Sequence, residues 1–362
     1  MSYSTVSESA SGFDCLYGQA EAVLALKRML KSRNIPNALL FTGNKDTGRR
    51  KAAICFARTL NCENKKASLS SNEPCNKCRS CRKIISGMHP DIIKVSPRKD
   101  KIKISQIRDI YPALTIAPHE AEMRMVMIEN AGKMNTQAGN ALLKMLEEPP
   151  ERTFFILLAE NIADLLPTII SRCRHIRFRP ISCESIKLKL MNEYDIDPEA
   201  ASIAAAASSG SITKALMLVN IRPYSDPGKP ADKPGNTVDW IKRRKWLVQE
   251  FSSLIIRAKK IRTDTSAALI LAEKLSREPD LLKDSISIIK TWLRDLAVYR
   301  YHPDKIINSD FSELLKNMTA WVSVQKVISW FLDLYAAESR IESNTSIRLT
   351  LEGFFLKLIC KG

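Results

Sequence analysis

The chain has 362 residues, of which 45% are hydrophobic and 26% charged, and its formal net charge is +17. This length is enough for two or three domains, each with its own core. No apolar run reaches the length of a membrane span, and the first residues do not have the pattern of a signal segment. These observations argue against a membrane or secreted protein, and we expect a cytoplasmic one. The excess of positive charge favours an anionic partner, nucleic acid first; the alternatives are a generally basic proteome or an acidic partner protein.

The first part of the chain has the pattern of a phosphate-binding loop. An amphipathic helix is predicted to begin near Gly18, after a polar, Ser-rich N-terminus. Residues 38–42 (Ala-Leu-Leu-Phe-Thr) predict a buried strand, and residues 51–60 predict a helix. Between them, Gly43 and Gly48 have the spacing of the motif G-x-x-x-x-G-K-[ST], whose backbone N–H groups can curl toward a phosphate.

Two residues of this loop depart from the motif. Arg49 stands where a lysine reaches the β- and γ-phosphates, and Arg50 stands where a Ser or Thr hydroxyl ligates Mg²⁺. Arginine is a planar fork and does not simply replace the compact charge of lysine. A cation at position 50 would lie where the metal belongs. The loop is therefore either no nucleotide site at all or a degenerate one.

A cysteine cluster follows the loop helix. Its members are Cys62, Cys75, Cys78 and Cys81, and the last three form C-x-x-C-x-x-C. Thiolates at this spacing, in a chain without a secretory signal, predict a tetrahedral Zn²⁺ site in place of disulfides. Four sulfur ligands close the site, so the zinc is expected to be structural. The alternatives are free thiols or an iron–sulfur cluster, which no redox motif accompanies. His89, in the next turn, is expected to be structural.

Strands alternate with helices as far as about residue 180. Further strands are predicted at 92–95, 125–128, 154–158 and 175–178. Helices are predicted after an N-cap at Ser105 and over 140–148, where two prolines end the second one. This alternation predicts an α/β domain with a parallel sheet over residues 14–180, interrupted by a cysteine module at about 62–90.

The strand at 125–128 ends in an acid. Glu129 stands where a Walker B carboxylate would hold Mg²⁺, and Asn130 follows it in the place of a residue that orients the attacking water. Glu129 is one methylene longer than the usual aspartate, and the Asn130 amide cannot accept a proton. The alternative interpretation of Glu129 is a surface carboxylate at the end of a strand.

The rest of the chain has a helical pattern. Residues 181–220 predict a small helical domain, 221–236 a linker rich in Pro and Gly, and 237–362 a third, all-helical domain. The densest basic run lies near the start of this third domain and comprises Lys242, Arg243, Arg244 and Lys245. We interpret this run as a solvated helix face and not as a DNA contact.

Taken together, the motifs resemble the bacterial clamp loaders, the AAA+ subunits of DNA polymerase III that open and load the sliding clamp. The resemblance is carried by residues 141–150 (Ala-Leu-Leu-Lys-Met-Leu-Glu-Glu-Pro-Pro), 171–173 (Ser-Arg-Cys) and 87–91 (Gly-Met-His-Pro-Asp), with the cysteine cluster. It covers the first 220 residues with specific motifs. It implies an AAA+ domain with an inserted zinc module, a helical lid at 181–220 and a helical collar for oligomerisation.

Within this family the chain resembles the delta-prime type of subunit, and not the gamma/tau motor, because of what it lacks. The motor has Gly-Lys-Ser/Thr and Asp-Glu where this chain has 48–50 (Gly-Arg-Arg) and 129–130 (Glu-Asn). The resemblance also places Glu160 at the sensor-1 threonine and Thr213 at the sensor-2 arginine of Gly-Ser-x-Arg. Four losses at one site imply that ATP is not hydrolysed there in cis.

Arg172 of the Ser-Arg-Cys triplet is retained. The resemblance implies that it is an arginine finger, which reaches in trans into a neighbouring gamma/tau ATP site and neutralises charge on the γ-phosphate. The alternative is an arginine that pairs within its own domain. Cys173 is expected to be a small buried residue and not a nucleophile.

The resemblance further implies partners and a location. The partners are gamma/tau and delta subunits, the sliding clamp through the complex, and primer–template DNA, at a bacterial replisome and without a membrane. Two rival hypotheses remain. One is an active gamma/tau-type ATPase in which Arg49 serves in place of lysine, and the other is a zinc-dependent nucleic-acid-binding protein without a clamp-loader role.

Overall fold

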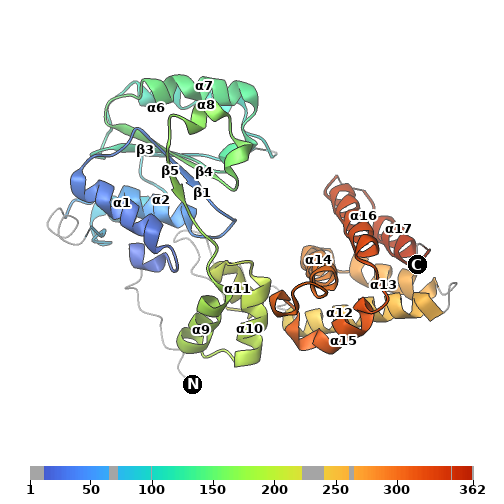
Figure 1. Ribbon diagram of the computed structural model, residues 1–362. Helices are drawn as coiled ribbons and strands as arrows, with labels where there is room; N and C mark the ends of the chain where they lie inside the picture. The colour runs from blue at the N-terminus through green and yellow to red at the C-terminus, as the bar shows by residue number, and fades with distance from the viewer. Residues whose placement is uncertain are drawn as a thin grey trace. The chain divides into compact units, whose positions relative to one another are not determined.

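A computed structural model describes residues 12–64, 72–98, 100–221, 240–260, 265–343 and 345–360 (Figure 1). The predicted linker at 221–236 lies outside these residues except for its first position, as does most of the polar N-terminus. The described residues form two compact units: the first runs to Leu188 and includes Ser209–Met217, and the second contains Lys189–Ser208, Leu218–Ile221 and the residues from 240 onward. Within the described ranges, no helix is both long and apolar enough to cross a membrane.

The first unit is built on a five-stranded sheet in which every pair of neighbouring strands is parallel. The strands, in the spatial order β2-β3-β4-β1-β5, are β1 (Ala38–Thr42), β2 (Ile92–Val95), β3 (Arg124–Ile128), β4 (Thr153–Ala159) and β5 (Arg174–Arg177). The three central strands are buried at every residue, which explains their continuous apolar runs in place of alternation. The predicted parallel α/β sheet is confirmed.

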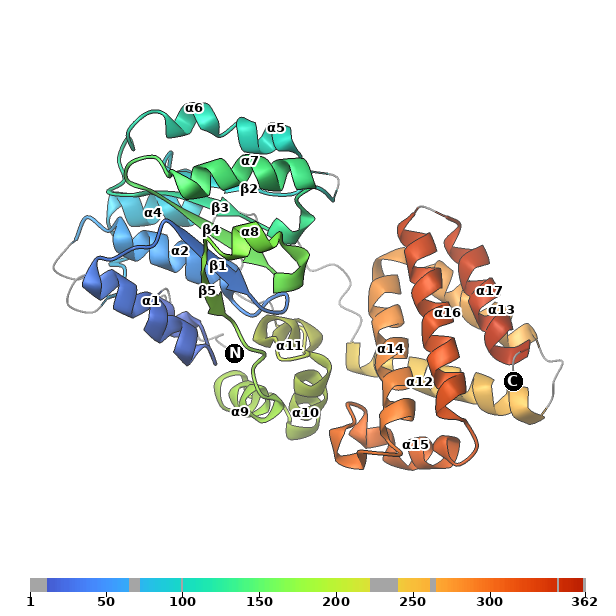
Figure 2. The ribbon, with the colours of Figure 1, turned by 45° about the horizontal axis from the view of Figure 1, so that its top comes forward.

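Helices cover both faces of this sheet (Figure 2). One apolar cluster joins the sheet to α1 (Ala20–Ser32), α2 (Arg49–Leu60) and α4 (Arg79–Ser86). The opposite cluster joins it to α5 (Ile104–Arg108), α6 (Tyr111–Leu114), α7 (Thr136–Glu147) and α8 (Pro167–Ile170). Side chains of successive strand residues alternate between the clusters, so that Phe41 packs in the first and Leu40 in the second.

Two helix starts differ from the prediction. Ser105 is not an N-cap: α5 begins at Ile104 after Lys103, whose backbone N–H donates to Oε1 of Gln106 at 3.2 Å. The helix predicted over 140–148 begins earlier, at Thr136, because Oδ1 of Asn135 accepts the Ala138 N–H at 2.8 Å and caps it there.

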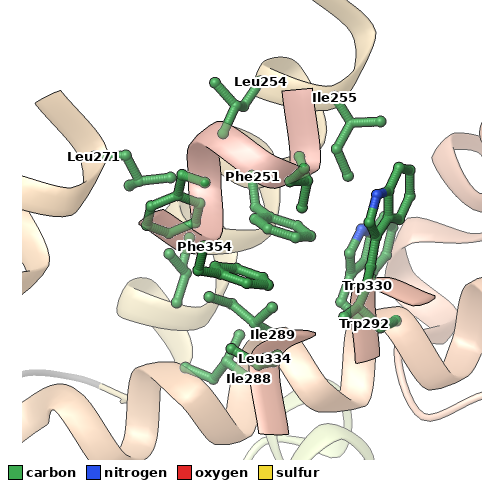
Figure 3. Packing of buried hydrophobic residues seen from close by; sticks show 14 of the residues in the cluster. Phe251, Leu254, Ile255, Leu271, Ile288, Ile289, Trp292, Trp330, Leu334 and Phe354 are labelled. Atoms are coloured by element: carbon green, nitrogen blue, oxygen red, sulfur yellow. The ribbon is translucent and has the colours of Figure 1, made fainter. Parts of the chain in front are cut away.

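The remaining elements are helical. The α-helices are α9 (Cys183–Tyr194), α10 (Pro198–Ala207), α11 (Ile212–Leu218), α12 (Trp240–Lys260), α13 (Ser266–Ser276), α14 (Leu282–Val298), α15 (Ser312–Thr319), α16 (Val324–Glu342) and α17 (Ile347–Cys360). Short 3₁₀ turns are η1 (Phe13–Cys15), η2 (Ala131–Lys133), η3 (Ile162–Asp164), η4 (Pro279–Leu281), η5 (Pro303–Lys305) and η6 (Ser309–Phe311). The core of the C-terminal helices is aromatic and aliphatic, with Phe251, Trp292, Trp330 and Phe354 among its members (Figure 3). The predicted all-helical C-terminal region is confirmed.

The basic run at the start of α12 is only in part the solvated face that we expected: Lys242 and Lys245 are exposed, but Arg243 and Arg244 are buried. Arg243 is buried, forms an ion pair with Glu278, and donates from Nη2 to Ser285 Oγ at 2.9 Å. Arg244, whose side chain is 1% exposed, donates to Asn308 Oδ1 at 2.9 Å and to Asp310 at 2.6 and 2.9 Å. Four consecutive residues span a full helical turn, so part of any such run must face the core.

Candidate functional site

The loop after β1 has the strand–loop–helix form of a phosphate-binding loop. Gly43 has φ +150°, and a Cβ at this position would lie 2.3 Å from the carbonyl oxygen of Phe178. Gly48 has φ +95° and stands directly before α2. Both glycines are therefore required by the backbone, as the motif demands.

The Arg49 side chain contacts the end of strand β4 of its own domain. Its side chain is buried, and Nη1 donates to the carbonyl oxygen of Ala159, the last residue of β4. Burial lowers the pKa of Arg49, while the nearby carboxylates of Glu160 and Asp46 oppose this shift. The guanidinium is thereby committed to the carboxyl end of the sheet and is not presented to the loop as a lysine ammonium would be.

Arg50 and Glu129 bind each other. Nε of Arg50 lies 2.7 Å from Oε1 of Glu129, and Oε2 of the same carboxylate accepts from Ser96 Oγ at 2.8 Å. In a working site of this layout, a hydroxyl at position 50 and an acid at the end of β3 would hold one Mg²⁺ between them. In this structure the positive charge beside Glu129 is the Arg50 guanidinium. Ser96 belongs to no motif, and nothing in the sequence pointed to it.

The other predicted positions lie around the same edge of the sheet. The Gly43 N–H donates to the carbonyl oxygen of Glu160 at 3.3 Å, and Ser211 Oγ donates to the carbonyl oxygen of Asp46 at 3.3 Å. Asn130 has φ +51° and precedes η2, a backbone conformation that asparagine tolerates well. Thr213 lies in the first turn of α11, which follows Ser211. The structure thus brings the loop, Glu129, Glu160 and the start of α11 together.

The four predicted metal ligands form a cluster. The Sγ atoms of Cys62, Cys75, Cys78 and Cys81 all lie within 4.8 Å of one another. Tetrahedral Zn–S bonds of about 2.3 Å place the sulfurs ~3.8 Å apart, so a small contraction of this cluster would hold the ion. Among the described cysteines none forms a disulfide. The donor set and its spacing fit a closed, structural zinc site.

Backbone donors already point at these sulfurs. The Cys78 N–H donates to Cys75 Sγ at 3.4 Å, and the Cys81 N–H donates to Cys78 Sγ at 3.3 Å. Burial acts to raise the pKa of the Cys75 thiol, but the N–H groups of Cys78 and Lys77 outweigh it and bring that pKa down to about 7. Such donors stabilise thiolates and orient them toward a metal.

The histidine and aspartate of segment 87–91 are structural, as expected for His89. His89 is buried, and its Nδ1 accepts the Asp91 N–H at 3.2 Å. Asp91 is fully buried and accepts from the N–H groups of His119, Glu120 and Ala121 at 2.8–2.9 Å. Arg124 lies 3.4 Å from the same carboxylate. This network anchors the segment before β3.

Arg172 lies on the surface, beside α7. Its Nη2 forms an ion pair with Glu147 Oε1 at 2.6 Å, and its Nη1 donates to the carbonyl oxygen of Thr168 at 3.0 Å. The arginine side chain is 37% exposed. An exposed ion pair contributes about 0–1 kcal/mol, so this contact does not prevent Arg172 from binding another anion. Burial raises the pKa of neighbouring Cys173 to about 12, which leaves that thiol protonated and unsuited to nucleophilic attack.

Comparison with known proteins relates these features to one family. Residues 18–182 match a family model described as DNA polymerase III, delta subunit. The chain is 28% identical over 341 residues to the DNA polymerase III subunit delta′ of Bacillus subtilis, a match that covers 94% of this chain and 96% of that protein. It is 32% identical over 213 residues to the tau subunit of the same organism, but this match covers only 37% of tau.

Among solved structures, a DNA polymerase III gamma subunit-related protein from Thermotoga maritima is 18% identical and has a TM-score of 0.45, with coverage of 95% of this chain and 99% of that one. The match to tau stops well short of that protein's length, whereas the match to delta′ runs through almost the whole of both chains. Over almost its whole length the chain is therefore similar to the delta′ subunit of bacterial DNA polymerase III, and its residues 18–182 match the model of the delta-subunit family.

Proposed function

We propose that this chain is a non-hydrolysing subunit of the clamp loader, which donates Arg172 in trans to ATP bound by a neighbouring gamma/tau subunit. The observation that carries the first half is the ion pair between Arg50 and Glu129. It joins the two positions that would otherwise share Mg²⁺, so a nucleotide in this loop would meet a fixed cation without its catalytic metal.

Two further features support the absence of hydrolysis in cis. Arg49 makes its hydrogen bond to Ala159, so no lysine-like charge is left to reach the β- and γ-phosphates. Asn130 follows Glu129 and carries no group that accepts a proton from water. These features also oppose the rival interpretation as an active gamma/tau-type ATPase.

The second half of the proposal depends on Arg172. Its guanidinium is exposed at the end of a short helix, within reach of a neighbouring molecule. An arginine supplied in trans stabilises the charge that develops during phosphoryl transfer and is worth roughly 10³–10⁵ in rate in enzymes that use one. A subunit that does not hydrolyse ATP itself can thus still control ATP hydrolysis by the neighbouring subunit.

The remaining assignments follow from the family. The domain over 14–180 would carry the zinc module, residues 181–220 would form the lid, and 237–362 would form the collar through which subunits assemble. The partners would be gamma/tau and delta subunits, with the sliding clamp and primer–template DNA contacted through the complex. The site of action would be the replisome in the bacterial cytoplasm.

Two measurements test this function. The isolated chain should show no ATP turnover above background in the presence of Mg²⁺ and primer–template DNA. In a complex reconstituted with gamma/tau and delta subunits, Arg172→Ala should lower DNA-stimulated ATP hydrolysis, whereas Arg174→Ala, an exposed arginine two residues away, should not. Turnover by the isolated chain would contradict the first half, and full activity of the Arg172→Ala complex would contradict the second.

A further inference from the structure

The backbone segment that carries Arg172 is held in place by core packing of α8. The short helix α8 packs on α7, where Gly139 leaves room for it: a Cβ on Gly139 would lie 2.8 Å from Cδ1 of Leu166. Ile169 of α8 is buried in the cluster that includes Leu142 of α7. The position of residue 172 relative to the last turn of α7 is therefore determined by buried contacts, and not by the surface ion pair itself.

Three contacts then orient the guanidinium. Nη1 of Arg172 donates to the carbonyl oxygen of Thr168 at 3.0 Å and to Ser171 Oγ at 3.4 Å, and Nη2 lies 2.6 Å from Oε1 of Glu147. Both hydrogen bonds are on the Nη1 side, so Glu147 alone sets the direction of the Nη2 side. The Nε–H donor has no partner within the described residues, so the guanidinium keeps a donor for a phosphate oxygen.

Helix stability does not account for a glutamate at position 147. Glu147 is the last residue of α7, where the helix dipole disfavours negative charge. Glu148 follows it and is also exposed, but it forms no ion pair within the described part of the chain. Both glutamates lie at the end of α7 that disfavours negative charge, but only Glu147 forms an ion pair with Arg172 within the described residues. This difference indicates that Glu147 has a role that Glu148 does not share.

We propose that Glu147 is a positioning residue for Arg172, an inference that depends on the proposed trans role of that arginine. A long arginine side chain has many rotamers, and each must be excluded before the guanidinium can meet the γ-phosphate of a neighbouring subunit. The Glu147 carboxylate selects one of them in advance. The effect is on the rate of the chemical step and not on the affinity of the neighbour for ATP.

The test compares five variants of this chain in the reconstituted complex with gamma/tau and delta subunits. They are Glu147→Gln, Glu147→Asp, Glu148→Gln, Arg172→Ala and the double variant Glu147→Gln/Arg172→Ala. We expect Glu147→Gln to lower kcat for DNA-stimulated ATP hydrolysis about tenfold with little change in KM. Glu148→Gln should behave as the unchanged chain, and Glu147→Gln should have no additional effect once Arg172 is absent. Glu147→Asp, which keeps the charge, should recover part of the loss.

The outcomes separate the two proposals. Full activity of Glu147→Gln beside a clear loss in Arg172→Ala would overturn the positioning role and leave the trans role intact. Full activity of Arg172→Ala would overturn both. A loss in Glu147→Gln that persists unchanged in the Arg172→Ala background, or a rise in KM alone, would assign Glu147 to assembly or nucleotide affinity and overturn its role as a positioning residue. Equal melting temperatures of the isolated chains serve as the folding control.

Discussion

Nε of Arg50 lies 2.7 Å from Oε1 of Glu129, so the two side chains that should flank a metal ion neutralise each other. The pair is partly exposed, with 43% and 22% of the two side chains accessible, and it adds little to stability. Its consequence is chemical: the Glu129 carboxylate, which also accepts from Ser96, is occupied before any metal arrives.

Removal of this pair should change nucleotide binding without creating an ATPase. The variant Arg50→Thr supplies the missing hydroxyl and frees Glu129 for a cation. We expect its affinity for Mg²⁺–ATP to rise on the order of tenfold, because a fixed positive charge leaves the metal position. Hydrolysis should remain absent, since Asn130 cannot activate water. Calorimetric titration and a phosphate-release assay measure the two quantities.

Lys51→Thr is the matched control for this variant. Lys51 is the next residue of α2 and is exposed, and its replacement by Thr also removes one positive charge. An equal gain in affinity in both variants would show that net charge, and not the pair with Glu129, limits binding. ATP turnover by Arg50→Thr would show that Asn130 is not a barrier to hydrolysis.

The cysteine cluster predicts a metal content that can be measured directly. The purified chain should carry one zinc ion, and Cys78→Ser should lose it, because a closed four-sulfur site needs every ligand. Metal binding to thiolates competes with protons, so zinc retention should weaken as the pH falls below neutrality. Elemental analysis after dialysis at several pH values gives both results. Cys183→Ser, at an exposed cysteine outside the cluster, should keep the metal.

The buried carboxylate of Asp91 should make part of the stability depend on acid pH. Burial acts to raise its pKa, but the N–H groups of Glu120, Ala121 and His119 and the charge of Arg124 outweigh it and hold the pKa below its usual range. A depressed pKa in the folded state stabilises the protein above the ordinary carboxyl pKa of about 4, and this contribution is lost as the pH falls through the folded pKa.

Asp91→Ala should therefore cost about 3–5 kcal/mol of unfolding free energy at neutral pH, since it leaves the buried Arg124 without its oppositely charged partner. It should also flatten the decline in stability below pH 4. Urea unfolding at pH 7 and at pH 3.5 measures both. Asp109→Asn, at an exposed aspartate, is the control and should change neither. A wild-type decline below pH 4 that persists in Asp91→Ala would assign the acid sensitivity to other carboxylates.

The elements of the first unit were predictable because their signals are local. The apolar runs of β1, β3 and β4 each predict a strand from a few neighbouring residues, and the structure confirms them. The cysteine spacing is a signal of the same local kind, and the structure brings the four Sγ atoms within 4.8 Å of one another. The departures of Arg49, Arg50 and Glu129 from the nucleotide-binding motifs were equally visible in the sequence, because these motifs have fixed spacing.

The partners of these residues were not predictable, because they come from distant parts of the chain. Arg50 meets Glu129 across 79 positions, and Arg244 meets Asp310 across 66. Arg243 and Arg244 in the basic run of α12 were misinterpreted as solvated for this reason: charge along a sequence does not reveal which side of a helix faces the acids and amides of distant segments. Likewise, Glu147 belongs to a recognisable segment, but only the packing of α8 on α7 places it beside Arg172.

The cysteine module also holds the N-terminal turn of the first unit, through Glu73. Oε2 of Glu73 accepts the Phe13 N–H at 2.8 Å, and Oε1 lies 2.6 Å from Lys27 Nζ. Phe13 is buried in the sheet core, and the Leu16 side chain lies 3.1 Å from where a Cβ of Gly48 would be. A carboxylate two residues before Cys75 thus fixes a turn that packs against the loop between β1 and α2.

Glu73→Gln should loosen this turn without a change in the metal content of the cysteine cluster. The part-buried Phe13 N–H loses a charged acceptor and Lys27 loses its ion-pair partner, a local cost of about 1–3 kcal/mol. Hydrogen exchange at residues 13–16 and alkylation of Cys15, located by peptide mapping, should both become faster, by roughly tenfold. Glu63→Gln is the matched control: Glu63 lies in the same module and accepts the Ser80 N–H at 3.1 Å, away from the turn. If exchange at residues 13–16 accelerates equally in both variants, the module as a whole and not Glu73 holds the turn. If it accelerates in neither, core burial of Phe13 is sufficient on its own.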